Sequence, residues 1–134
     1  MEWTPNLGAW SRHLHKCYHS IMAYRVVELL LEDGTSPYAE WFAVLSPEVA
    51  VKVSTALVRV QQGNLSRVEW FCGIGEYKID YGPGWRIYLA KDGLQLIVLL
   101  GGGSKKGQQA DIERAVALWH EYKRRNTETS KRGK

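Results

Sequence analysis

The sequence predicts an α+β domain: an antiparallel sheet made of an N-terminal strand and a three-strand meander, with a helical hairpin and a C-terminal helix. Two stretches begin with Ser-Pro and then repeat apolar residues with the period of a helix. The residues on either side of a Gly-Pro-Gly turn alternate between apolar and polar, as strands of a half-buried sheet do. A last segment again carries an apolar stripe at helical spacing. A chain of 134 residues suits one domain with one modest core.

The first half of the domain is expected to hold a strand and two helices. Residues 23–31 are rich in Val and Leu and predict a strand, which the turn residues 33–36 end. Ser36 and Ser46 each precede a proline, so each is expected to cap a helix that has proline at its first position. The first helix is predicted over residues 37–45. The second is predicted to end at Gly63-Asn64.

The second half is expected to form the meander. Residues 65–75 show no period and are expected to be irregular, whereas residues 76–81 and 85–90 alternate as strands. After a turn at Asp92-Gly93, the apolar run 94–100 predicts a central strand covered on both faces. Gly101, Gly102 and Gly103 are expected to end it, and a helix is predicted over residues 108–123.

Composition narrows the class of protein. Hydrophobic residues make up 45% and charged residues 24% of the chain, which is ordinary for a soluble globular protein. No apolar run reaches the ~18 residues of a membrane span, and the N-terminus has no continuous apolar segment of a secretory signal. Two cysteines give no disulfide framework. We therefore expect a cytoplasmic protein that contacts no membrane.

Charge and composition divide the chain into three parts. Residues 1–21 contain two of the Trp and three of the four His, and we expect them to be an appended or flexible leader. Residues 22–125 form the expected domain. The last twelve residues hold six Lys or Arg and one Glu, so we expect residues 126–134 to be a disordered basic tail. Such a tail either attracts polyanions such as nucleic acid or only aids solubility.

The leader contains residue types that bind zinc, at alternate positions: His13, His15, Cys17 and His19. Their spacing matches no standard zinc motif, so we expect no metal site. Cys72 is expected to be a packed thiol, and His120 a solvated residue of the last helix.

The Gly82-Pro83-Gly84 hairpin is the strongest candidate for a functional site. Side chains of a strand point alternately to the two faces of a sheet. If Tyr81 pairs with Trp85, the apolar residues of both strands and Tyr81 therefore share one face. The other face then carries Lys78, Asp80, Arg86 and Tyr88. In this register Asp80 lies opposite Arg86, and Lys78 lies opposite Tyr88. A guanidinium, an ammonium and a phenol within reach of one another suit cleavage of a phosphodiester without a metal. The alternative is an ordinary Asp80–Arg86 pair on a solvated sheet face.

The loop after the last strand offers a second, weaker candidate. Its glycines and the helix start behind them could leave amide groups free to bind an anion, with Lys105, Lys106 and Gln108 as phosphate-binding residues. The loop does not fit the phosphate loop of nucleotide hydrolases. The alternative is a flexible connection with exposed lysines.

Two runs and the apolar strand between them carry a family resemblance. The runs are GEYKIDYGPGWRIY at residues 75–88 and GGSKKGQQADI at residues 102–112. Together they closely resemble the HigB-like "addiction module killer" branch of the RelE/ParE toxin superfamily. The resemblance covers about residues 22–125 and implies the same order of strands and helices.

The resemblance also implies a function: the toxin of a type II toxin–antitoxin pair. Many such toxins are endoribonucleases that cut mRNA, often on the translating ribosome, with no cofactor. Arg86 matches the family's strand arginine at the scissile phosphate, Lys78 a basic residue proposed to help proton transfer, and Lys106 a basic residue past the last strand. Asp80 and Ile112 stand where RelE has a lysine and a tyrosine. Tyr88 is our candidate to replace that phenol.

The remaining assignments complete the hypothesis. Glu76 and Asp80 are assigned structural or modulating roles. The expected partners are mRNA and a small helix-turn-helix antitoxin, with DNA contacted only through the antitoxin. Two alternatives stay open: a ParE-like toxin that inhibits DNA gyrase by binding, and an inactive module that only binds its antitoxin.

Overall fold

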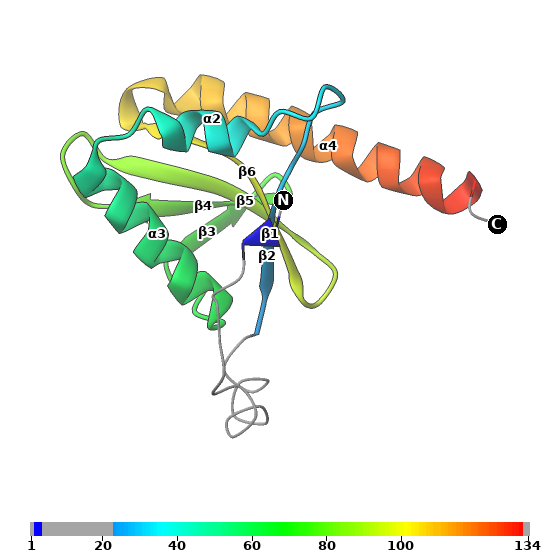
Figure 1. Cartoon of the computed structure of the whole chain (residues 1–134), viewed down its shortest axis with the longest axis horizontal. Helices are drawn as coiled ribbons and strands as arrows, with labels where there is room; N and C mark the ends of the chain where they lie inside the picture. Colours follow the sequence, from blue (N-terminus) through cyan, green and yellow to red (C-terminus); the bar gives the residue numbers. More distant parts are fainter. Residues whose placement is uncertain (1, 4–22, 133–134) are drawn as a thin grey trace.

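The protein, described here by a computed structural model of residues 2–3 and 23–132, has one six-stranded sheet with helices on both faces (Figure 1). The strand order is β1-β2-β6-β5-β4-β3. The strands are β1 Glu2–Trp3, β2 Arg25–Glu28, β3 Val68–Phe71, β4 Ile74–Ile79, β5 Trp85–Asp92 and β6 Leu96–Ser104. The helices are α2 Pro37–Ala43, α3 Pro47–Gln61, the short 3-10 helix η2 Lys105–Gly107, and α4 Gln108–Arg132. The α+β class is confirmed.

The helical hairpin forms as its local sequence predicts. The Ser36 hydroxyl accepts a hydrogen bond from the Ala39 amide at 3.0 Å, and the Ser46 hydroxyl accepts one from the Val49 amide at 3.4 Å. Each cap satisfies an amide that the first helical turn leaves unpaired, and proline costs nothing at the next position because its missing N–H would have no partner there.

The sheet differs from the predicted one in three places. The pair β2–β6 is parallel, so the expectation of an antiparallel sheet is wrong there. Residues 65–75, expected to be irregular, contain β3, which joins β4 through a two-residue turn at Cys72-Gly73. Both turn residues have positive φ, at 51° and 81°, which matches the twist of a tight hairpin. Cys72 is exposed and not packed as we expected.

The third difference concerns β6, which continues through the three glycines that we expected to end it. Tyr88 of β5 pairs with Gly101, but Leu89 pairs with Leu99, so Leu100 is an extra residue that forms a bulge. The residues of β6 before the bulge alternate into the two cores, which confirms the expected central strand covered on both faces.

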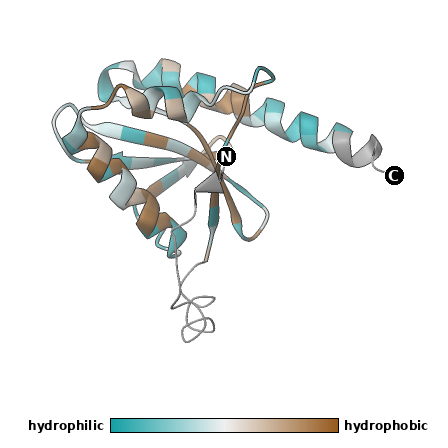
Figure 2. Cartoon of the chain, viewed as in Figure 1, coloured by the Kyte–Doolittle hydropathy of each residue, from teal (hydrophilic) through white to brown (hydrophobic). Residues whose placement is uncertain are grey.

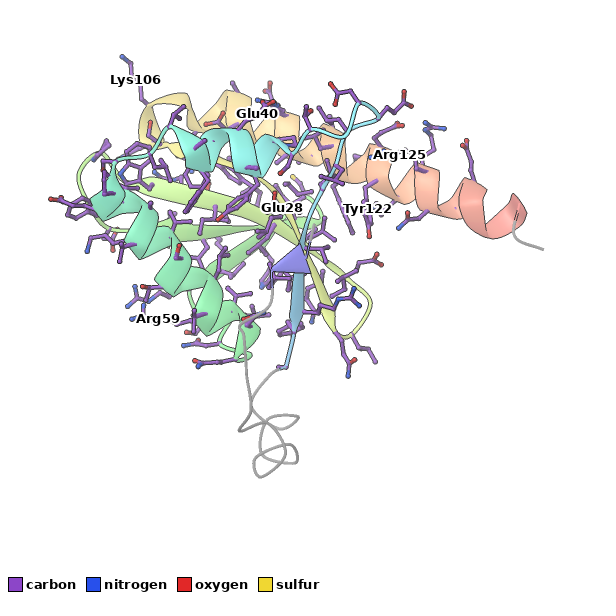
Figure 3. The ribbon with its side chains drawn as sticks, in the orientation of Figure 1. Glu28, Glu40, Arg59, Lys106, Tyr122 and Arg125 are labelled. Carbon is purple, nitrogen blue, oxygen red and sulfur yellow. The ribbon has the colours of Figure 1, made fainter. Side chains whose placement is uncertain are left out.

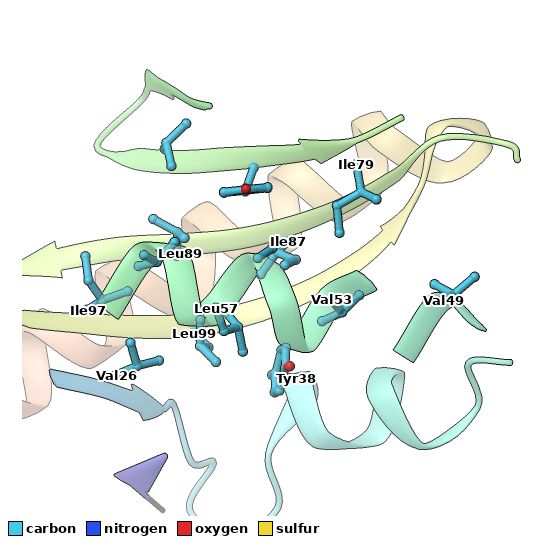
Figure 4. Packing of buried hydrophobic residues seen from close by; sticks show 14 residues of the cluster. Val26, Tyr38, Val49, Val53, Leu57, Ile79, Ile87, Leu89, Ile97 and Leu99 are labelled. Carbon is cyan, nitrogen blue, oxygen red and sulfur yellow. The ribbon is translucent and has the colours of Figure 1, made fainter. Parts of the chain in front are cut away.

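Two apolar layers stabilise the sheet. On one face, Val53 and Leu57 of α3 and Tyr38 of α2 pack against strand residues such as Ile87 and Leu99 (Figure 4). On the other face, α4 covers a second set: Leu29, Ile74, Tyr88, Ala90, Val98 and Leu100. Side chains of a strand alternate between faces, so each central strand contributes to both layers.

The N- and C-terminal segments depart from the predicted division of the chain. The strand β1 lies within the expected leader and pairs with β2, with Glu2 opposite Val27. The leader's histidines and Cys17 lie outside the described residues. The helix α4 continues to Arg132, so residues 126–132, expected to be disordered, are helical. The C-terminal part of α4 projects beyond the sheet (Figure 1), and the coloured turns of this part, before the grey end, carry mainly hydrophilic residues (Figure 2). No helix in the described ranges has the length and apolar character of a membrane span.

Candidate functional site

The β4–β5 hairpin groups the expected residues on one face, in a different register from the predicted one. Lys78 lies opposite Arg86, and Glu76 lies opposite Tyr88, so both predicted cross-strand pairs are wrong. The register is shifted by two residues, and a shift of two keeps every side chain on its face. Tyr81 lies outside the strand. It is exposed, and its hydroxyl donates a hydrogen bond to Glu48 of α3, so its predicted place in the core is wrong.

Arg86 is buried beneath the start of α4. It is 7% exposed, and its Nε lies 3.7 Å from a carboxylate oxygen of Glu76, which is itself buried. The same oxygen accepts a hydrogen bond from the Gln108 side chain at 2.9 Å. The expected open cationic face centred on Arg86 is therefore wrong, and so is the alternative Asp80–Arg86 pair. The pairing with Glu76 fixes Arg86 because an unpaired charge in such a place costs several kcal/mol.

The carbonyl of Gly84 joins the hairpin turn to the end of β6. It accepts hydrogen bonds from the Arg86 guanidinium at 3.1 Å and from the Lys105 amide at 2.9 Å. The hydrogen bond from the Lys105 amide holds η2 against the turn. The side chains of Lys105 and Lys106 are exposed. Lys106 points away from the corner between β6 and α4 (Figure 3).

Lys78 and Asp80 lie outside the buried group formed by Arg86 and Glu76. The Lys78 side chain is 48% exposed and pairs with Glu69 of β3 at 3.5 Å, a surface contact of little energetic weight. Asp80 follows β4 and is exposed. The structure therefore brings Glu76, Arg86 and Gln108 together, and it leaves Lys78 and Asp80 at the surface.

A pocket of about 250 Å³ lies between α2, β6 and the first turns of α4. Its polar lining comes from Tyr88, Asp111 and Arg114, with Glu40 and Trp41 of α2 on the other side. Within the described part of the chain, neither the Tyr88 hydroxyl nor the Trp41 indole N–H has a hydrogen-bond partner, although both atoms are buried. Buried polar atoms without partners are uncommon, and here two of them belong to residues that line one pocket.

The glycines of β6 shape this pocket. A side chain at Gly102 would overlap the ring of Trp41, and a side chain at Gly103 would overlap the carboxylate of Asp111. Glycine at these two positions therefore lets α2 and α4 approach the strand closely. The glycine run was expected to end the strand, with a flexible connection as one alternative, but it belongs to β6, and its missing side chains admit Trp41 and Asp111.

Two titratable groups of the pocket have shifted pKa values. Burial raises the pKa of Tyr88, and the nearby carboxylate of Glu76 raises it further. Partial burial raises the pKa of Asp111, and the charge of Arg114 opposes that shift. Tyr88 is therefore a neutral proton donor at ordinary pH, and Asp111 is a more basic carboxylate than an exposed aspartate.

The pocket therefore holds a carboxylate of raised pKa, a neutral phenol and one cation, Arg114, with Glu40 as a second carboxylate. Tyr88 was identified from the sequence, and Asp111 and Arg114 were not. Their spacing on α4, three residues apart, places them on one side of the helix. Only the close approach of α4 to Gly103 shows that this side faces the strand.

Comparisons with known proteins give a family but no activity. No family model and no solved structure matches the chain. It is 34% identical over 89 residues to an uncharacterized protein of Haemophilus influenzae, and the match covers 65% of this chain and 90% of that protein. The chain therefore belongs to the same family as the Haemophilus protein.

Proposed function

We propose that this chain is the toxin of a type II toxin–antitoxin pair with a RelE/ParE-like fold, and that it cleaves RNA in the cytoplasm. The observation that carries the proposal is the pocket that combines Tyr88, Asp111 and Arg114. The implied strand, helical hairpin, meander and last helix occur in the implied order, with two added strands, β1 and β3, and a parallel β2–β6 pair. The proposed partner is a small helix-turn-helix antitoxin.

The pocket lining carries one cation, Arg114, and two carboxylates, Glu40 and Asp111, so further cations for an RNA backbone must come from outside the pocket. Arg114 lines the pocket, whereas Lys105 and Lys106 are exposed on η2 outside its lining, where they can bind phosphates of the RNA chain that lie beyond the scissile bond. Fixed cations lower the energy of a phosphorane-like transition state because negative charge builds up on its oxygens.

The proposed reaction is an attack by the ribose 2′-hydroxyl on the adjacent phosphorus. The carboxylate of Asp111 accepts the 2′-hydroxyl proton as the new P–O bond forms, and its raised pKa makes it a better base than an exposed aspartate. The bond from phosphorus to the 5′-oxygen breaks, and Tyr88 donates its proton to that oxygen. The products are a 2′,3′-cyclic phosphate and a 5′-hydroxyl. Asp111 then returns a proton to the Tyr88 phenolate, which restores both groups.

Arg86 has a positioning role in this proposal. Its guanidinium binds the Gly84 carbonyl and lies beside Glu76, which in turn holds Gln108 at the start of α4. These contacts place α4, and with it Asp111, over the sheet.

The proposal is tested by mapping 5′ ends of cellular RNA after a short pulse of expression, and by cleavage of a synthetic RNA in vitro. Asp111→Asn keeps the shape of the side chain, and we expect it to lower the cleavage rate by ~10²-fold or more, as the loss of a general base does. Glu113→Gln removes the same charge from an exposed position on the same helix and is the matched control. Site-specific RNA cleavage that survives Asp111→Asn would remove Asp111 from the mechanism.

One observation favours a second candidate, a toxin that acts by binding alone. Arg86, the family's expected phosphate ligand, is buried against Glu76, so the residue that the resemblance makes catalytic does not face a substrate. A ParE-like gyrase inhibitor would leave RNA intact and cause DNA damage in the same pulse experiment. Unaffected growth would indicate an inactive module that only binds its antitoxin.

A further inference from the structure

A second hollow lies on the other face of the hairpin, between α3 and β4. It has a volume of about 320 Å³, and we call it the α3–β4 groove. Its lining residues are Val51, Lys52, Thr55, Ala56, Arg59, Arg67, Tyr77, Ile79 and Asp80. Tyr77 belongs to the core layer under α3, whereas Tyr88 belongs to the layer under α4, so this groove is separate from the candidate active site.

The groove is cationic. Lys52, Arg59 and Arg67 contribute three positive charges, and Asp80 contributes the one negative charge of its lining. Arg59 extends from α3 on the exposed side of the molecule (Figure 3). As far as the structure is described, no acidic side chain lies within salt-bridge distance of Arg59 or Arg67. Cations held at the edge of a hollow, without internal partners, are available to an anionic ligand.

Tyr77 provides an independent indication of a ligand. This lining residue is 1% exposed, and its hydroxyl finds no hydrogen-bond partner among the residues described. A buried hydroxyl without a partner costs free energy, and a carboxylate bound in the groove would accept a hydrogen bond from it.

The apolar part of the lining identifies the kind of ligand. Val51 is 65% exposed, and the largely buried Ala56 and Ile79 line the same groove. Single-stranded nucleic acid stacks its bases on aromatic rings with open faces. The one aromatic side chain of this lining, Tyr77, is buried, and the ring of the neighbouring Tyr81 carries the ammonium of Lys52 on one face. Aliphatic surface with cations around it instead complements a peptide that carries both acidic and apolar side chains.

The edge of the sheet next to the groove suits an extended peptide. Arg67 directly precedes β3, and the outer edge of β3 pairs with no other strand of the described sheet. A peptide in the groove can therefore continue along β3 and form main-chain hydrogen bonds with it.

We infer that the α3–β4 groove binds an acidic, partly apolar segment of a partner protein, with Arg59 and Arg67 binding its carboxylates and Val51 contacting its apolar side chains. This inference does not depend on RNA cleavage. In a toxin–antitoxin pair the segment would belong to the antitoxin.

The inference is tested by selecting peptides from a phage-displayed random library against the full chain. We expect the enriched peptides to contain several Asp or Glu together with aliphatic residues. The dissociation constant of the best peptide, measured by fluorescence anisotropy, should rise about tenfold or more in Arg59→Ala/Arg67→Ala, a loss of about 1.4 kcal/mol. Tyr77→Phe should also weaken binding, because it removes only the unpaired hydroxyl.

The matched control removes two positive charges elsewhere. Lys91→Ala/Lys123→Ala changes two exposed lysines outside the groove and should leave the dissociation constant unchanged. Equal weakening by both double variants would show a nonspecific charge effect and overturn the inference. Peptides without acidic residues, or a polyuridine oligonucleotide that competes through Arg59 and Arg67, would also overturn it. RNA cleavage by the Arg59/Arg67 variant should equal that of the wild type, which separates this test from that of the active site.

Discussion

Removal of the Tyr88 hydroxyl should stabilise the protein and impair its reaction. Tyr88→Phe keeps the ring, which is 1% exposed, and deletes an oxygen that has no hydrogen-bond partner among the described residues. A buried hydroxyl without a well-formed hydrogen bond costs about 1–3 kcal/mol. The Glu76 carboxylate beside the Tyr88 hydroxyl offsets part of that cost, so the free energy of unfolding should rise by at most about 1 kcal/mol. For a domain of this size that corresponds to an increase in Tm of at most about 3–5 °C. Loss of a general acid should lower the rate of RNA cleavage by ~10²-fold or more.

Both effects are measurable on one preparation. Urea unfolding followed by tryptophan fluorescence gives the free energy of unfolding, because the chain contains six Trp. Cleavage of a labelled RNA oligonucleotide gives the rate. Tyr122→Phe is the matched control, since the Tyr122 hydroxyl donates a hydrogen bond to Asp92 at 2.7 Å. It should lower stability by about 0.5–1.5 kcal/mol and leave the cleavage rate unchanged.

Two results would refute this reasoning separately. A Tyr88→Phe variant that unfolds more easily than the wild type would show that the hydroxyl is paired in the folded protein. A variant that cleaves RNA at the wild-type rate would show that Tyr88 is not the general acid, whatever its stability.

Three further predictions follow from the same pocket and its supports. Arg86→Met should lower the free energy of unfolding by about 3–5 kcal/mol in urea titrations because it leaves the Glu76 charge buried and unpaired, and Arg86→Met/Glu76→Leu should recover most of that loss. Cleavage should decline as pH falls through the raised pKa of Asp111, and Arg114→Ala should move this decline to higher pH in a pH–rate profile, because Arg114 lowers that pKa. The effect of pH on stability has the opposite sign. Ionising Asp111 costs more free energy in the folded than in the unfolded chain, so the contribution of Asp111 to the free energy of unfolding decreases as pH rises through its raised pKa. Gly103→Ala should displace Asp111, lower stability by about 1–3 kcal/mol and lower the cleavage rate, as unfolding and cleavage assays would show.

The sequence was sufficient to predict those elements whose structure depends only on residues close by in the chain. Ser36 and Ser46 cap helices because a hydroxyl and an amide three residues later are enough to form the motif. The hairpin β3–β4 was missed because its turn holds Cys72 in a left-handed conformation that Asn or Asp usually adopts. In the β4–β5 hairpin the last pair is Ile79 with Trp85, so the turn is two residues longer than expected, and Tyr81 within it bonds to Glu48 of α3, which is distant in the sequence.

The candidate site depended on contacts between elements, which periodicity does not reveal. Alternation correctly placed Lys78, Arg86 and Tyr88 on one face, because a register shift of two leaves the face unchanged. It did not show that α4 covers this face, and so it left Arg86 at the surface. The sequence feature that indicated this packing of α4 was the glycine run. Position 103 requires glycine because the Asp111 side chain of α4 lies against it.

The hairpin of β4 and β5 contributes one buried tyrosine to each face of the sheet, Tyr77 toward α3 and Tyr88 toward α4. Phenylalanine would fill either space equally well, and in the described structure neither hydroxyl has a partner. At about 1–3 kcal/mol each, the two hydroxyls cost a large share of the 5–15 kcal/mol that stabilises a typical domain. Packing therefore does not explain why these side chains are tyrosines. Tyr77 lines a hollow bordered by Arg59 and Arg67, so an anionic ligand there would supply the missing hydrogen bond and offset the cost. Tyr88 lines a pocket that holds one arginine and two carboxylates, and a ligand there would need an acceptor atom placed against the hydroxyl and beside Arg114.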